Sequence, residues 1–338
     1  MFKIGNIELS APIILAPMSG VSDFPFRTIS RSLGCEFAFL EMISARALAY
    51  RGRKTFRMIT TIEADKPLGI QLLGADLQYI LKAMDIINGY DFEIIDFNAA
   101  CPVPKVIKRG EGASLLKEPK KLREILKVIV EHSKKPVSLK IRSGWNDDSI
   151  NAVDVALYAQ DAGIKYLFIH GRTKVQGYSG RVDYRIIKKV KEALNIPVIG
   201  SGDALSPQLI KKMFDETGCD AVTIARGALG NPWIFPQTAE FLKSGILSAA
   251  PALDKIADTM IKHFNLCCDY HGERIGVIIF RKFFYWYTRK IIGSPRCPSG
   301  LPEKVGEAGI KTLRNKVVHS KTKEQVMDII NELVSNKL

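Results

Sequence analysis

The sequence predicts an α/β fold, a (β/α)8 TIM barrel followed by a smaller C-terminal helical domain. Short apolar runs alternate with longer amphipathic stretches, which is the pattern of repeated strand-then-helix units in a parallel sheet. Eight runs recur at about 25 to 30 residues, with one longer gap, as a closed barrel requires. An open doubly wound sheet is the alternative. The runs span residues 12–17, 37–42, 68–73, 92–97, 137–141, 166–169, 197–200 and 221–225.

The stretches between the runs carry helix signals. Residues 118–133 and 206–218 are amphipathic, and Ser206 followed by Pro207 is typical of an N-cap and a first helical position. The opening residues 2–9 alternate around Gly5 and Asn6, which predicts a hairpin that plugs the bottom of the barrel.

The strand signal stops after about Leu242, and residues 254–272, 276–293 and 324–334 are predicted helices. We therefore divide the chain into a catalytic barrel, residues 1–242, and a helical RNA-binding domain, residues 243–338. Residues 244–338 hold 15 Lys and Arg against 9 Asp and Glu, a denser positive charge than in the barrel, which suits phosphate contacts. The aromatic residues of 281–290 are predicted core by their spacing, and base stacking is the alternative.

The composition limits the class of protein. The chain has 338 residues, is 46% hydrophobic and carries a formal charge of +14, which indicates either a polyanionic partner or simple solubility. Its six cysteines show no C-x-x-C pair and no metal-ligand spacing, so we expect no disulfide framework and no metal site. The apolar runs fit neither a signal peptide nor a membrane span, so we expect a cytoplasmic protein.

Polar and reactive residues follow the predicted strands, whose carboxyl ends meet at one mouth in a barrel. Glycines in GSGDAL and ARGALGNP follow the last two strands, where barrels bind phosphate through backbone N–H groups. This collection predicts an active site at the mouth. Its members are Met18, Ser19, Glu41, Gln71, Asn98, Cys101, Lys140, Arg142, His170, Arg172, Ser201, Asp203 and Arg226.

Cys101 lies in a long loop after the fourth predicted strand, beside Pro102, Pro104 and several basic residues. A thiol on a loop at the mouth of the barrel can deliver a proton to carbon as a general acid. A free cysteine is more often a small buried hydrophobe, which explains the cysteines at 35, 219, 267 and 268 better than Cys101.

Several motifs in order resemble the tRNA-dihydrouridine synthase family over almost the whole chain. They are APMSGVSDFPFR at 16–27, QLLG at 71–74, DFNAACP at 96–102, KIRSGW at 140–145, HGRTKVQGYSG at 170–180, GSGD at 200–203 and ARGALGNPWIF at 225–235. The first motif most resembles the bacterial branch. Two motifs depart from the usual family pattern, with Ser201 in place of Asn in one, and Ala99 with Ala100 in place of Met-Gly or similar in the other.

The resemblance implies a monomeric enzyme that reduces uridines of tRNA, with FMN re-reduced by NADPH or NADH. Hydride would go to C6 of the uracil and Cys101 would protonate C5. The resemblance places FMN against Ala16, Pro17, Met18, Gln71, Lys140 and His170, and its phosphate against Ser201, Gly202, Asp203, Ala225 and Arg226. It places the target uracil against Asn98, with Arg172 and the QGYSG segment at 176–180 lining the entrance.

Two other functions remain open from the sequence. A small-molecule flavin reductase or a dihydroorotate dehydrogenase-like enzyme would share the barrel mouth and a loop cysteine, but it leaves the basic C-terminal residues unexplained. A non-catalytic RNA-binding protein on the same barrel is the other alternative.

Overall fold

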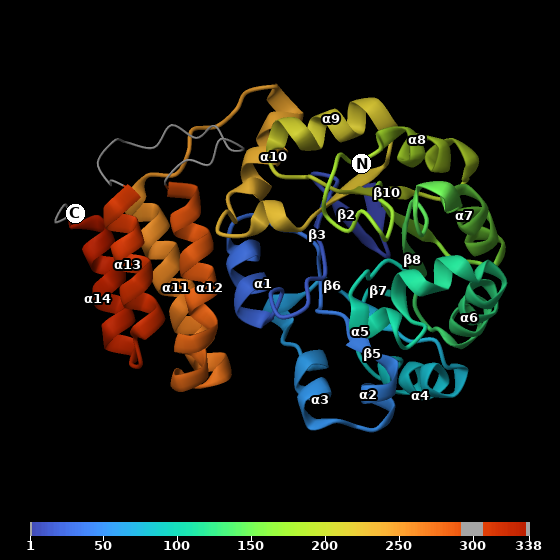
Figure 1. Ribbon diagram of the computed structural model, residues 1–338, viewed down its shortest axis with the longest axis horizontal. Coiled ribbons are helices and arrows are strands. Elements are labelled where there is room, and N and C mark those ends of the chain that lie inside the picture. The colour runs from blue at the N-terminus through green and yellow to red at the C-terminus, as the bar shows by residue number, and fades with distance from the viewer. Residues whose placement is uncertain (1, 292–306, 336–338) are drawn as a thin grey trace. The chain divides into compact units, whose positions relative to one another are not determined.

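The structure, a computed structural model that describes residues 2–291 and 307–335, contains a closed barrel of eight parallel strands (Figure 1). The strands pair in the order β4-β3-β11-β10-β9-β8-β7-β6, and pairing of β4 with β6 closes the ring. This confirms the predicted TIM barrel and excludes the open sheet. The barrel strands are β3 (Ile13–Leu15), β4 (Ala38–Phe39), β6 (Leu68–Leu73), β7 (Ile94–Asn98), β8 (Val137–Arg142), β9 (Tyr166–His170), β10 (Val198–Ser201) and β11 (Ala221–Ile224).

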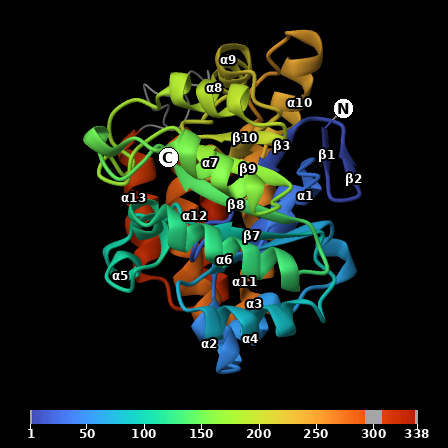
Figure 2. The same ribbon diagram turned by 90° about the vertical axis from the view of Figure 1, so that its right-hand side faces the viewer.

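Helices follow the strands and cover the outside of the barrel, where α6, α7 and α8 lie side by side (Figure 2). Helix α6 is an example of how these helices pack on the barrel. Its buried residues Leu122, Ile125, Leu126 and Ile129 recur at helical spacing and so form one apolar face. The predicted helices at 118–133 and 206–218 are confirmed as α6 and α9. The helices of this layer are α4 (Leu77–Ile87), α6 (Pro119–His132), α7 (Ala152–Asp161), α8 (Tyr184–Ala193) and α9 (Pro207–Thr217).

Shorter elements occupy the loops at the carboxyl ends of the strands. The two-residue strand β5 (Ile43–Ser44) pairs with Leu72 and Leu73 at the end of β6. Helices α2 (Ala45–Ala49) and α3 (Arg53–Ile59) follow it, and α5 (Pro104–Ile107) follows β7. Three 3-10 turns also follow strands, η2 (Gly112–Lys117), η3 (Asp147–Ser149) and η4 (Arg226–Ala228), whereas η1 (Glu63–Asp65) leads into the amino end of β6.

The N-terminal hairpin closes the amino end of the barrel, as predicted. Strands β1 (Phe2–Ile4) and β2 (Ile7–Leu9) pair antiparallel through a turn in which Gly5 has φ +60°. Its apolar side chains pack with residues that begin barrel strands, and Gly5 N donates to the Tyr166 hydroxyl at 3.0 Å. The floor of the barrel is therefore apolar and sealed.

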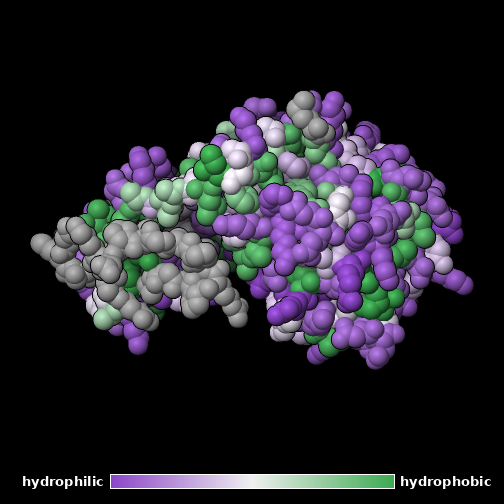
Figure 3. All heavy atoms as spheres, turned by 90° about the horizontal axis from the view of Figure 1, so that it is seen from above, coloured by the Kyte–Doolittle hydropathy of each residue, from purple (hydrophilic) through white to green (hydrophobic). Residues whose placement is uncertain are grey.

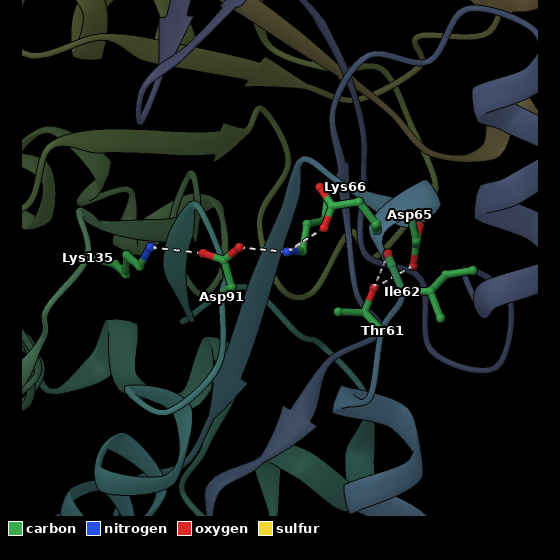
Figure 4. A network of polar contacts seen from close by, with 7 residues as sticks. Thr61, Ile62, Asp65, Lys66, Asp91 and Lys135 are labelled. Atoms are coloured by element: carbon green, nitrogen blue, oxygen red, sulfur yellow. Dashed lines mark hydrogen bonds and ion pairs between the residues drawn. The ribbon is translucent and has the colours of Figure 1, made fainter.

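Asp91 connects the segments that lead into three neighbouring strands (Figure 4). Its carboxylate accepts from Lys66 at 2.6 Å and from Lys135 at 3.4 Å, before β6 and β8. Hydrogen bonds from these two lysines hold the pKa of Asp91 below its ordinary value. Because the pair with Lys66 is exposed, it orients the chain more than it stabilises the fold.

Contacts group the chain into two compact units. Unit 1 comprises residues 1–23, 36–204 and 208–225 and holds the barrel, and unit 2 comprises residues 24–35, 205–207 and 226–338. The division of function at residue 242 stays a prediction. Apart from η4, the helices of unit 2 are α1 (Phe24–Ser32), α10 (Ile234–Ser244), α11 (Leu253–His271), α12 (Glu273–Ile291), α13 (Glu307–His319) and α14 (Lys323–Val334).

Unit 2 has an aromatic core. The Phe26 ring of α1 stacks on Phe283 of α12 with ring centres 5.7 Å apart, so a helix from the first barrel repeat belongs to this unit. Phe283, Phe284 and Tyr287 are buried and Trp286 is half-buried, which confirms that the aromatic residues of 281–290 are mainly core. The predicted helices appear as α11, α12 and α14, whereas α13 and the membership of α1 were not predicted.

The visible face in Figure 3 is mainly hydrophilic over the barrel unit. Within residues 2–291 and 307–335, no helix is both long and apolar enough to cross a membrane, and no cluster of three or more potential metal ligands occurs. None of the five cysteines in these ranges forms a disulfide, and Cys297 lies outside the described residues.

Gly230 is the position in unit 2 that leaves least room for a side chain. It has φ +61°, and a Cβ there would overlap the backbone of Trp286 and Tyr287 in α12. Gly245, which ends α10, has φ +73° with open space around it. Both glycines have a positive φ that disfavours other residues, but only Gly230 lacks the space for a side chain.

We predict that Gly230→Ala lowers the free energy of unfolding by about 2 kcal/mol or more beyond the effect of Gly245→Ala, because overlap adds to strain. Urea unfolding of both variants measures the difference. Equal losses would contradict the tight packing of Gly230 on α12.

Candidate active site

Strand register brings the predicted polar residues to the carboxyl end of the barrel in unit 1. Gln71 of β6 lies opposite Asp96 of β7, and Asn98 lies opposite Lys140 of β8. Along β7, residues two apart share a face, so Asp96 and Asn98 point to the same side as Ile94, which belongs to the interior core. The mouth therefore carries a polar layer above the apolar floor.

A chain of buried hydrogen bonds runs through this layer to the cysteine loop. Asp96 accepts from Ser138 Oγ at 2.7 Å and from Gln71 Nε2 at 2.6 Å. Gln71 Oε1 accepts from Asn98 Nδ2 at 2.7 Å, and Asn98 Oδ1 accepts from Cys101 N at 2.8 Å. Because an ionised carboxylate only accepts, Asp96 determines the orientation of both amides.

Burial moves the pKa values of Asp96 and Lys140 from their ordinary values toward neutral pH. Removal from water raises the pKa of the Asp96 carboxyl to about 6. Removal from water also lowers the pKa of Lys140 to about 8, against the opposing attraction of Asp96. Perturbed groups of opposite charge at one mouth are typical of functional sites.

The loop that carries Cys101 is held in place by backbone contacts with residues 112 and 113. The Cys101 carbonyl accepts from Ala113 N at 3.1 Å. Gly112, with φ +61°, faces it so closely that a Cβ at residue 112 would lie 2.7 Å from the Cys101 carbonyl oxygen. Burial raises the pKa of the Cys101 thiol, although the positive charges of Arg142 and Arg109 oppose this rise. The thiol therefore holds its proton at neutral pH.

Arg142 joins the cysteine loop to the loop after β9. Its Nε donates to the Ala100 carbonyl at 2.8 Å, and one terminal nitrogen donates to the carbonyls of Thr173 and Gly177 at 2.9 and 2.8 Å. The side chain is 2% exposed, so this cation is a fixed part of the site.

Arg172 uses its guanidinium inside the protein. It donates to the carbonyls of Ser179 and Gly180 and to both oxygens of Asp203, and it approaches His170 Nε2 at 3.4 Å. All five N–H groups therefore have partners. Since a guanidinium only donates, His170 Nε2 is the acceptor in this contact. In this structure Arg172 positions its neighbours.

The last two barrel strands end in the glycine-rich segment predicted to bind phosphate. Ser201 is buried and Gly202 has φ +121°, where a Cβ would crowd Val182 and approach His170. Asp203, with φ +48°, has its carboxylate on Arg172, which leaves its backbone N–H as the group suited to an anion. Ala225 ends this segment in unit 1, whereas Arg226 begins η4 in unit 2.

The first barrel strand supplies the remaining predicted contacts. Ala16 is buried and its N–H donates to the Ile224 carbonyl at 2.9 Å. Pro17 and Met18 are half-buried just beyond β3, and Met18 N donates to Ser22 Oγ at 2.8 Å. They present a largely apolar edge.

The residues present could hold a flavin. Lys140 is a cation for the ring, and Gln71 keeps one N–H and one lone pair for its pyrimidine edge. Gly202 leaves room where a larger residue would crowd its neighbours, as close approach of a phosphate requires. The donor set contains both the charge and the open backbone that such a group needs.

Two residues of the site were not singled out in the sequence, where Asp96 and Tyr178 appear only within motifs. Asp96 was quoted only as part of a motif, although its place two residues before Asn98 puts it on the same strand face. Tyr178 is 59% exposed, with its ring centre 6.3 Å from that of His170 and 5.5 Å from the Arg142 guanidinium carbon. Nothing in its spacing distinguishes it from a solvent-exposed loop residue.

We predict that Asn98→Ala speeds hydrogen exchange of the Ala100 and Cys101 amides roughly fivefold, because each loses its acceptor. Asn98→Asp keeps an acceptor at that position and should leave exchange near the wild-type rate. Mass spectrometry of exchanged peptides measures both. Unchanged protection in the alanine variant would show that other contacts hold the loop.

Comparison with known proteins identifies the family of this chain. The family model for dihydrouridine synthase matches residues 14–297, which contain all the barrel strands except the first residue of β3. A probable tRNA-dihydrouridine synthase of Rickettsia conorii is 35% identical over 340 residues, covering 100% of this chain and 99% of that protein. The tRNA-dihydrouridine synthase B of Vibrio parahaemolyticus is 38% identical over 288 residues, covering 85% and 89%. The chain therefore belongs to the dihydrouridine synthase family.

Proposed function

We propose that this protein reduces uridines of tRNA to dihydrouridine, with FMN as its cofactor and NADPH or NADH as the reductant. The observation that carries the proposal is a protonated, half-buried thiol, Cys101, tied by hydrogen bonds to a mouth that also holds Gln71, Asn98 and Lys140. Membership of the family supports the same reaction.

The proposed flavin site uses residues from most of the barrel strands. The chemistry that bound FMN would supply is hydride for C6 of the uracil, with a nicotinamide as the reductant that restores it. Lys140 and Gln71 would contact the ring, with Ala16, Pro17 and Met18 along it and His170 beside it. The phosphate would be held by Ser201, Gly202, Asp203, Ala225 and Arg226.

Cys101 is the proposed general acid. Its S–H proton goes to C5 of the uracil, and the sulfur keeps the bonding pair as a thiolate. The positive charges of Arg142 and Arg109 favour that thiolate, whereas burial favours the thiol beforehand. The loop thus holds a proton that neighbouring cations help to release.

Asn98 is the proposed substrate contact. Its Oδ1 accepts from two backbone N–H groups and one N–H of Nδ2 donates to Gln71. One N–H therefore remains for a uracil carbonyl oxygen. Arg172 would act on the substrate through the 176–180 segment that it holds.

The RNA must present its target base outside the stack, because the C5–C6 bond is inaccessible within a helix. We propose that the basic residues of 243–338 grip backbone phosphates while the barrel, residues 1–242, performs the chemistry. The cytoplasmic location and the monomeric state expected from the sequence stay predictions.

We predict that the protein with FMN and NADPH adds two hydrogen atoms to a uridine of unmodified tRNA, measured by mass spectrometry of nuclease fragments. Cys101→Ala should keep flavin and RNA affinity but lose most turnover, about a hundredfold or more, because it lacks the proton donor. Near-normal turnover of this variant would remove Cys101 from the mechanism. Reduction of free uracil compounds without RNA binding would favour a small-molecule reductase.

We predict that flavin affinity falls as the pH rises through about 8, because Lys140 loses the charge that it holds below its pKa. Lys140→Met should weaken binding roughly ten- to hundredfold at pH 7 and remove this pH dependence. Lys140→Arg keeps a cation and should bind flavin equally at both ends of the range. Fluorescence titration of FMN measures all three, and unchanged affinity in the methionine variant would exclude the role.

A further inference from the structure

The segment between β5 and η1 is strongly and uniformly basic. Residues 42–62 contain Arg46, Arg51, Arg53, Lys54 and Arg57 and no acidic residue. All five side chains are exposed in α2, α3 and the turn between them. Charge of one sign over a continuous surface indicates an anionic partner.

This surface lies at the rim of the barrel mouth. Helix α2 begins at Ala45, directly after β5, whose residues pair with Leu72 and Leu73 at the carboxyl end of β6. Figure 1 shows α2 and α3 together on that side of the barrel, next to α4. The basic residues and the cysteine loop therefore belong to the same end of unit 1.

Several cations on the outer helices have carboxylate partners, whereas three cations of this segment have none among the described residues. Lys188 and Lys211 each have a carboxylate one turn further along their helix, Glu192 and Asp215. Arg51, Arg53 and Lys54 form no ion pair among residues 2–291 and 307–335. Their charges are left for a ligand.

The backbone conformation and the helix dipole both disfavour basic residues at these positions. Arg51 has φ +53°, a conformation that L residues rarely adopt. Arg53 and Lys54 occupy the first turn of α3, where the helix dipole disfavours cations and no acidic residue compensates. These residues are thus poorly explained by folding alone.

Two tyrosines lie beside the cations. Their hydroxyls, on Tyr50 and Tyr79, are 3.0 Å apart, and the Arg46 guanidinium carbon lies 5.9 and 5.4 Å from the two ring centres. Tyr50 is 66% exposed. An exposed ring held in place by a hydrogen bond and a cation is suited to stacking with an unpaired base.

We propose that this rim surface, defined as Arg46, Tyr50, Arg51, Arg53, Lys54, Arg57 and Tyr79, is a second RNA-binding surface, carried by the barrel unit. The arginines and lysine bind backbone phosphates of the RNA around the target uridine, and Tyr50 stacks with a looped-out base. Aromatic rings among the cations favour RNA over a purely anionic partner. The proposal rests on the proposed function, because the RNA that it binds is the substrate.

The charge contribution is tested with the triple variant Arg51→Gln, Arg53→Gln, Lys54→Gln. Its matched control is Lys188→Gln, Lys189→Gln, Lys212→Gln, which removes the same charge from α8 and α9. We predict that the rim variant binds tRNA at least tenfold more weakly, with a salt slope reduced by about 2. It should raise KM for tRNA without lowering kcat, while the control changes binding less than about twofold.

Equal weakening in both triple variants, or none in the rim variant, overturns the proposal. Direct binding, measured by filter retention or anisotropy with unmodified tRNA, separates it from the proposed function. A wild-type protein that binds tRNA through the rim but forms no dihydrouridine would refute the reaction and keep the surface. A protein that forms dihydrouridine with an unaffected rim variant would do the reverse.

The stacking contribution is tested with Tyr50→Ala and Tyr50→Phe. We predict about five- to tenfold weaker tRNA binding for the alanine variant and wild-type binding for the phenylalanine variant, which keeps the ring. Equal losses in both would assign the effect to the hydroxyl and contradict stacking. Circular dichroism at the same temperature verifies that each variant is folded.

Discussion

The acceptor-only carboxylate of Asp96 is the constraint on which the geometry of the mouth depends. Two donors, Gln71 Nε2 and Ser138 Oγ, bond to it, so the Gln71 amide must turn its oxygen to Asn98. Asn98 then must turn its own oxygen to the backbone of the cysteine loop. A neutral hydroxyl or amide in place of Asp96 could reverse each of these bonds, because it can donate as well as accept. One buried charge thereby determines the orientation of two side chains and the position of a third.

The barrel separates the needs of stability and of chemistry along its axis. The floor is apolar and closed by the N-terminal hairpin, whereas the mouth buries Asp96, Arg142 and Arg172. Burying charges is costly unless each has partners, and here every one has hydrogen bonds at 3.2 Å or less. The strands below the polar layer supply an ordinary hydrophobic core, and the stability of that core offsets the free-energy cost of burying these charges.

The sequence predicted the barrel well because its signals are local. Each strand is a short apolar run, and each outer helix, such as α6, repeats its buried residues at helical spacing. The membership of α1 in unit 2 could not be predicted, since it depends on contacts such as Phe26 with Phe283, far apart in the chain. The role of Arg172 could not be predicted either. Its position at a strand end indicated the mouth, but its hydrogen bonds inside the protein depend on how the following loop folds.

The two alanines before Cys101 show how a departure from a family pattern can be accommodated. Glycine matters in such a loop only where φ is positive, and neither Ala99 nor Ala100 has positive φ. The sharp return of the chain instead occurs at Gly110 and Gly112, whose φ values are +69° and +61°. Ala100 is held through its N–H by Asn98 and through its carbonyl by Arg142. Hydrogen bonds at both ends of this peptide thus fix the loop without the freedom that glycine would provide, and the path to Cys101 is compatible with alanine at both positions.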